Sequence, residues 1–200
     1  MSIVVCNNNS LSAITSIPAS ITGGALNLIS TQTASSSSTI SFTSGIDSTY
    51  KEYIFKFINI HPATDDKNFQ INFRDGGSDF DATKTTTMFR ALHSEDGGTS
   101  GLAYRTGNDL AQSTSAQDIS EGLSNDADHG ASGTLHLFDP SSTTFIKHFI
   151  ATTNGCHEGD ITREVFTAGY FNTTTALTRV RFKFDSGDID SGTIKMYGVV

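Results

Sequence analysis

The 200-residue sequence contains no tryptophan, only three prolines and only two cysteines. Cys6 and Cys156 are too few for a disulfide framework, so we expect two free thiols. So little proline beside eighteen glycines excludes a collagen-like fibre. No stretch approaches the roughly 20 consecutive apolar residues of a transmembrane helix. The first residues, 1–7, lack the basic segment and the apolar length of a signal peptide. We therefore expect synthesis in a cytoplasm, without membrane insertion and without secretion by this route.

Positive charge is also scarce, because 13 Lys and Arg face 21 Asp and Glu and leave a formal net charge of −8. An acidic surface repels the phosphates of nucleic acids and the headgroups of anionic lipids. The composition therefore predicts neither a nucleic-acid partner nor a membrane partner. Solubility is the simplest role of the acidic excess.

Apolar residues make up 36% of the chain, and they alternate with polar residues in short stretches between Ser, Thr, Asn and Gly turns. This period-two pattern is typical of β-strands. In the clearest stretch, 51–60, the aromatic residues share one face and the isoleucines share the other, which predicts a strand buried on both faces. Phe69, Ile71 and Phe73 alternate up to a glycine-rich turn at 75–78, which predicts a hairpin.

Further strands are predicted near 26–28, 40–42, 85–93, 134–139, 144–152, 164–171, 177–184 and 193–199. Residues 96–132 are expected to form one long connection, with a short helix near 109–117. Loops of this length usually bind or contact something. The pattern predicts an all-β fold over residues 26–200: an antiparallel β-sandwich, and within that class a jelly roll.

Residues 1–25 differ from the rest because they contain neither an aromatic nor a charged residue. Ile14, Ile17 and Ile21 recur at spacings of three and four, but Pro18 interrupts any helix they would form. We expect this segment to be an extended N-terminal arm that packs against a neighbouring subunit or another protein.

Several acidic stretches have the composition of ion sites, but each fits a polar turn more simply. They are 75–81, 125–129 and 185–190, and none has the spacing of an EF-hand loop. His136 and His148 lie on strands that are expected to pair, without any established metal-binding spacing. Cys156, His157 and Glu158 resemble a catalytic triad in composition, but adjacent strand residues face opposite ways and do not give triad geometry. The sequence predicts a non-enzymatic protein with no cofactor and no metal site.

Six phrases of the sequence point to a family. They are Leu28–Ser35, Ile40–Tyr50, Tyr53–Pro62, Lys84–Thr87, Phe138–Ser142 and Gly192–Gly198. Together they resemble a family of small virion structural proteins of marine tailed bacteriophages, including cyanophages. The resemblance covers most of the chain and implies a component of the tail, of the adsorption apparatus or of the capsid surface. It implies no catalytic or ligand-binding residues.

These observations predict a bacteriophage virion protein, assembled in the bacterial host cytoplasm and exposed on the particle. We expect a tail-fibre or adsorption component, and a capsid decoration protein is the alternative. Its expected partners are other virion proteins and copies of itself, in a trimer because such assemblies follow rotational symmetry. A carbohydrate-binding module is a further alternative, with Tyr104 and Tyr170 as candidate contacts to a host surface glycan.

Overall fold

The computed structural model describes residues 25–200, and this part of the chain folds into twelve β-strands without a helix. The predicted all-β class is therefore confirmed. The strands are β1 (Leu26–Ser37), β2 (Ile40–Phe42), β3 (Glu52–Pro62), β4 (Phe69–Arg74), β5 (Lys84–Ser94), β6 (Ser100–Tyr104), β7 (Gln117–Asp118), β8 (Ala131–Phe138), β9 (His148–His157), β10 (Ile161–Phe171), β11 (Arg179–Phe184) and β12 (Ile189–Val199). The predicted arm, with Ile14, Ile17 and Ile21, lies almost wholly outside the described residues.

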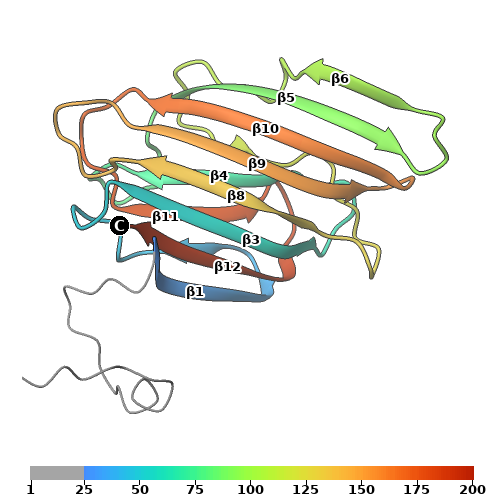
Figure 1. Ribbon diagram of the computed structural model, residues 1–200, viewed down its shortest axis with the longest axis horizontal. Helices are drawn as coiled ribbons and strands as arrows, with labels where there is room; N and C mark the ends of the chain where they lie inside the picture. The colour runs from blue at the N-terminus through green and yellow to red at the C-terminus, as the bar shows by residue number, and fades with distance from the viewer. Residues whose placement is uncertain (1–24) are drawn as a thin grey trace, which may run out of the picture.

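The strands form two antiparallel sheets packed as a sandwich, as the sequence predicts. One sheet has eight strands in the order β1-β12-β3-β8-β9-β10-β5-β6, and the other has four in the order β2-β11-β4-β7. Figure 1 shows the large sheet as one broad layer with β4 and β11 behind it. The finer prediction of a jelly roll is not confirmed, because a jelly roll has eight strands in two Greek keys, whereas here twelve strands divide eight and four.

Aromatic packing fills the space between the sheets. Phe182, in the centre of β11, has its ring centroid 5.3–6.1 Å from those of Phe42, Phe55, Phe57 and Phe69. All five rings are almost fully buried. Two of these four contacts are edge-to-face, the arrangement that the ring quadrupole favours. The large phenylalanine side chains thus compensate for the low content of apolar residues and fill the core.

The outer face of the large sheet also carries apolar side chains. The strand register places one residue from each of seven strands in line across this face: Leu28, Tyr197, Ile54, His136, Ile150, Ala168 and Thr87. We call this line the outer apolar row. Ile150 in its middle is 51% exposed, and Leu28 at one end is 52% exposed. Since residues directly opposite each other share a face, these side chains lie side by side. His136 and Thr87 in the row are polar, and Ile54 is only 9% exposed.

The prediction that 51–60 is buried on both faces is wrong in part. Phe55 and Phe57 are in the core, but Ile58 is 40% exposed on the outer face. The register then shifts between Phe57 and Ile60, and Ile60 is fully buried. A β-bulge of this kind changes which residues of a strand face inward. The isoleucines therefore do not share one face.

Residues 96–132 are not one unstructured connection, and the short helix expected near 109–117 is wrong. β6 forms a hairpin with β5, and β7 adds a short edge to the small sheet. Backbone hydrogen bonds in both directions join Lys84 to Ser113 at 2.9–3.0 Å, and Thr86 N–H donates to the carbonyl oxygen of Leu110. These long-range pairings use the backbone groups that a helix would need. The turn at 75–78 is not a hairpin either, because β4 and β5 belong to different sheets.

A buried carboxylate anchors this segment to the large sheet. Glu121 forms ion pairs with Arg90 of β5, at 2.8 Å, and with Arg105. Arg163 of β10 donates from Nη1 to the backbone carbonyl of Glu121 at 3.2 Å. Burial lowers the pKa of Arg163, and the neighbouring Arg90 acts in the same direction. The segment is thus tied to two neighbouring strands through one residue: the Glu121 carboxylate binds β5, and its backbone carbonyl binds β10.

Candidate functional site

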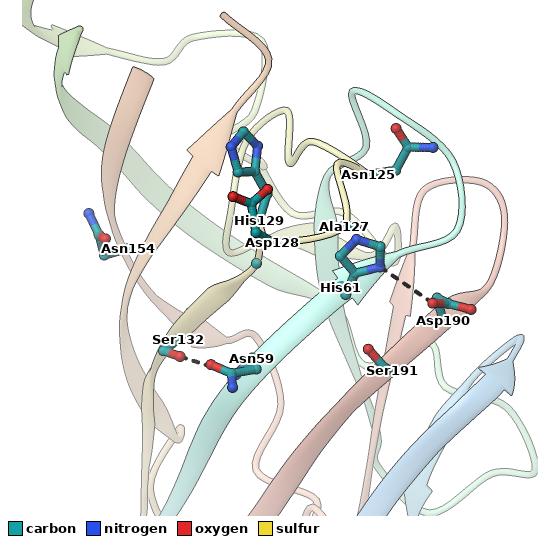
Figure 2. Close-up of a pocket in the computed structure, with 11 residues that line it drawn as sticks. Asn59, His61, Asn125, Ala127, Asp128, His129, Ser132, Asn154, Asp190 and Ser191 are labelled. Atoms are coloured by element: carbon teal, nitrogen blue, oxygen red, sulfur yellow. Dashed lines mark hydrogen bonds and ion pairs between the residues drawn. The ribbon is translucent and has the colours of Figure 1, made fainter. Parts of the chain in front are cut away.

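A polar cleft of about 700 Å³ opens at one end of the sandwich. It is formed where β3, β8, β9 and β12 meet the loop at 124–130 (Figure 2). Its lining consists almost entirely of amide, hydroxyl, carboxylate and imidazole groups: Asn59, His61, Asn125, Ala127, Asp128, His129, Gly130, Ser132, Asn154, Asp190 and Ser191. Such a lining offers hydrogen bonds in many directions and little apolar surface.

Two irregular strands shape the floor of the cleft. Asn59 has a φ of 50°, in the left-handed region, and lies within the bulge of β3. The facing strand β12 also shifts its register around Ser191, where Gly192 has a φ of 129°. A Cβ atom at Gly192 would lie 2.7 Å from the carbonyl oxygen of Asn59. The close approach of the two backbones therefore requires glycine at this position.

Histidine rings connect the elements around the cleft. Nε2 of His61 lies 3.1 Å from the carbonyl oxygen of Asp126, and its Nδ1 lies 3.5 Å from Asp190 Oδ2. Figure 2 shows the pairing of His61 with Asp190 across the cleft. The ring of His129 lies between the carboxylates of Asp126 and Asp160, at 3.7 and 3.9 Å. In both rings Nδ1 is buried and has no hydrogen-bond partner.

The loop at 124–130 is held in place by its backbone. Asn125 N–H donates to Asp65 Oδ1 at 3.2 Å, and this hydrogen bond lowers the pKa of Asp65. Asp126 N–H donates to Ser124 Oγ, and Ser124 N–H donates to the carbonyl oxygen of Cys156 on β9. Asn125 and Asp128 are therefore presented from a fixed backbone.

A second cavity, of about 340 Å³, adjoins the cleft and shares Asp128, His129 and Asn154 with it. Cys156 lines this cavity as a free, half-buried thiol. Burial raises the pKa of Cys156, and nearby carboxylates raise it further, so the thiol stays protonated at neutral pH. His157 places Nδ1 against the carbonyl oxygen of Glu158 and Nε2 3.6 Å from Asp66. Neither ring nitrogen is directed at the thiol, so the three adjacent residues do not form a triad.

The other residues suggested by the sequence lie apart from one another. No group of three or more His, Cys, Asp or Glu within residues 25–200 has a geometry that can hold a metal ion. His136 and His148 do lie on paired strands, but His136 binds Glu52 at 2.6 Å, whereas His148 faces the ring of Tyr170.

Tyr104 and Tyr170 both lie on the outer face of the large sheet, but in different surroundings. Tyr170 lines a shallow depression of about 510 Å³ with His148, Ile150 and the threonines of 85–87. Tyr104, on the edge strand β6, donates from its hydroxyl to Asp109 at 2.6 Å. It does not line the depression around Tyr170, so the two tyrosines do not form one site.

Sequence reasoning found part of the cleft and missed the rest. The stretch 125–129 was a candidate because of its composition, and it does form the rim. Asn59, His61, Asn154 and Asp190 come from three strands that only the fold brings together. One signal was available: Asn59 is an amide that interrupts the most apolar stretch of the chain.

Within residues 25–200 there is no helix that is long and apolar enough to cross a membrane. No protein family, curated protein or solved structure matches the chain.

Proposed function

We propose that this chain is a non-enzymatic structural protein of a bacteriophage particle, assembled in the host cytoplasm and exposed on the tail fibre or adsorption apparatus. The observation that carries the proposal is the outer apolar row. It crosses seven of the eight strands of the large sheet and leaves aliphatic side chains such as Ile150 half exposed.

An exposed band of this extent favours a protein that works against other subunits. Contiguous apolar patches are small on most monomeric proteins, and larger ones usually mark interaction sites. The row itself contains no Asp, Glu, Lys or Arg, although the chain as a whole has a net charge of −8. Other virion proteins are therefore its natural partners, in keeping with the resemblance of the sequence to phage structural proteins.

Immunogold labelling of purified particles tests this proposal. Antibodies raised against residues 26–200 should label particles at the tail. Labels on the head would instead favour a capsid decoration protein, the alternative within the same class. Antibody that binds the isolated protein but labels no part of the particle would contradict both.

We further propose a homo-oligomer, with a trimer as the expected form and with residues 1–25 as its anchoring arm through Ile14, Ile17 and Ile21. Light scattering on the full chain and on a chain lacking residues 1–25 tests this. An oligomer whose number of chains falls to one third on truncation, while each chain stays folded, supports the arm as an assembly element. A truncated chain that keeps the full oligomer shows that the arm is not needed for assembly.

Carbohydrate binding is a second candidate function, and the polar cleft favours it. The carboxylate of Asp128 and the amides of Asn125 and Asn154 can bond several sugar hydroxyls at once. The depression at Tyr170 offers an aromatic ring instead. The site would serve attachment to a host surface glycan.

A panel of bacterial surface oligosaccharides, screened by thermal shift, tests the carbohydrate proposal. Loss of the shift in Asn154→Ala would assign binding to the cleft, and loss in Tyr170→Ala would assign it to the depression. If no oligosaccharide in the panel shifts the melting temperature, the carbohydrate proposal is wrong while the structural proposal stands.

A further inference from the structure

Strand β6 is an unprotected edge of the large sheet. It is the last strand in the sheet order, and Figure 1 shows it at the border opposite β1. All five of its residues, Ser100–Tyr104, are exposed, and none is charged or proline. Its register with β5 continues without a bulge. Natural edge strands usually carry a charge, a proline or a bulge that prevents pairing with another chain.

The hydrogen bonds of this hairpin show which backbone groups are free. Ser94 N–H donates to the carbonyl oxygen of Thr99 at 2.8 Å, and Arg105 N–H donates to that of Met88 at 2.9 Å. Hydrogen-bonded pairs alternate along an antiparallel ladder. Residues 101 and 103 therefore direct their N–H and C=O groups towards β5. Ser100, Leu102 and Tyr104 direct theirs away from the sheet, where no described strand meets them.

We infer that this edge pairs with β6 of a second copy of the chain, antiparallel, about a twofold axis at Leu102. Leu102 then lies opposite Leu102 of the second copy, and the two exchange both of their N–H···O=C hydrogen bonds. Ser100 lies opposite Tyr104 of the second copy, and these two residues also exchange both of their backbone hydrogen bonds. The two large sheets become one continuous sheet.

Three features make a second copy the occupant of this edge. The outward-facing backbone groups are symmetric about Leu102, so the strand is complementary to itself. Leu102, at the centre, is 73% exposed and would be covered by its own counterpart. The strand carries no charge, so two copies of this acidic chain meet there without repulsion.

This interface does not depend on the proposed role in a phage particle. A twofold axis yields an even number of chains, whatever other contacts form. If the expected trimer also forms through another surface, the two symmetries together give a hexamer. Failure of the edge pairing would thus leave the particle role untouched.

Light scattering on the full chain and on Leu102→Lys tests the inference. The wild-type protein should contain an even number of chains, and Leu102→Lys should halve its mass, because two ammonium groups would face each other across the axis. An equimolar mixture of Leu102→Lys and Leu102→Glu should regain the wild-type mass. Leu102 is exposed, so neither variant should unfold, and circular dichroism checks this.

Phe145→Lys is the matched control. It makes the same kind of change at an apolar residue that is 70% exposed and lies in the loop between β8 and β9, outside strand β6 and outside the outer apolar row. It should keep the wild-type mass. The inference is overturned by a wild-type protein with an odd number of chains, monomer or trimer. It is also overturned if Leu102→Lys keeps the wild-type mass, or if the mixture does not recover it.

Discussion

Lys84 gives the sharpest test of the core, because its amine lies fully inside the sandwich. The side chain is 0% exposed. Its Nζ donates to Asn72 Oδ1 at 2.9 Å and to the carbonyl oxygen of Ala82 at 3.2 Å. Burial lowers the pKa of Lys84 from 10.5 to about 8, while Asp75 and Asp81 act in the opposite direction. In the unfolded chain the pKa of Lys84 returns to its ordinary value of 10.5.

The sign and size of the effect follow from this difference. Between pH 8 and pH 10.5 the unfolded chain holds more protons on Lys84 than the folded chain. The free energy of unfolding therefore rises with pH across this window. One pKa unit corresponds to about 1.4 kcal/mol, so the full difference is about 3 kcal/mol, of which about 2.5 kcal/mol develops between about pH 7 and about pH 10.

Urea unfolding of the wild-type protein and of Lys84→Met measures this. Methionine is unbranched like lysine and does not titrate. All other titrating groups are shared, so their contribution cancels in the difference between the two proteins. The wild type should gain about 2.5 kcal/mol relative to the variant between about pH 7 and about pH 10. Two curves that stay parallel across this range would refute the burial of a charged amine at Lys84.

Three further substitutions test the core, the cleft floor and the anchored segment, each by urea unfolding. Phe182→Ala should lower the free energy of unfolding by about 3–5 kcal/mol, because it leaves a cavity at the centre of the aromatic core. Phe145 is exposed, so Phe145→Ala should change the free energy of unfolding by less than about 0.5 kcal/mol. Gly192→Ala should lower the free energy of unfolding by at least about 1–3 kcal/mol, because its Cβ would lie 2.7 Å from a backbone oxygen. Gly107→Ala is the control and should leave the free energy of unfolding unchanged, because there is open space around Gly107. Glu121→Gln should lower the free energy of unfolding by about 3 kcal/mol, because it leaves two partly buried arginines without their carboxylate. An unchanged midpoint would show that the network is not stabilising.

The period-two pattern predicted most of the fold because it reports one physical fact, which residues face the core. Phe69, Ile71 and Phe73 follow it strictly, and all three are buried in β4. The pattern does not report partners. It therefore missed that the turn after β4 crosses to the other sheet, and that the backbone near Ser113 pairs with Lys84 instead of forming a helix.

The cleft was harder to predict because its residues are distant in sequence. Asn59 and Asp190 meet only after β3 and β12 pair and both strands bulge at the same level. A bulge depends on the contacts between two paired strands, so the sequence of either strand alone does not predict it. The exposed face of the large sheet was missed for a similar reason: Ile58 has the pattern of a core residue, and only the number and order of the strands leave it outside.

The central claim is that this chain is a structural component of a phage particle, and quantitative mass spectrometry of purified, salt-washed particles tests it most directly. The account predicts that the chain remains with the particles at a fixed number of copies, in a constant ratio to the other tail proteins. A chain that is abundant in the infected-cell lysate but absent from the washed particles would contradict it.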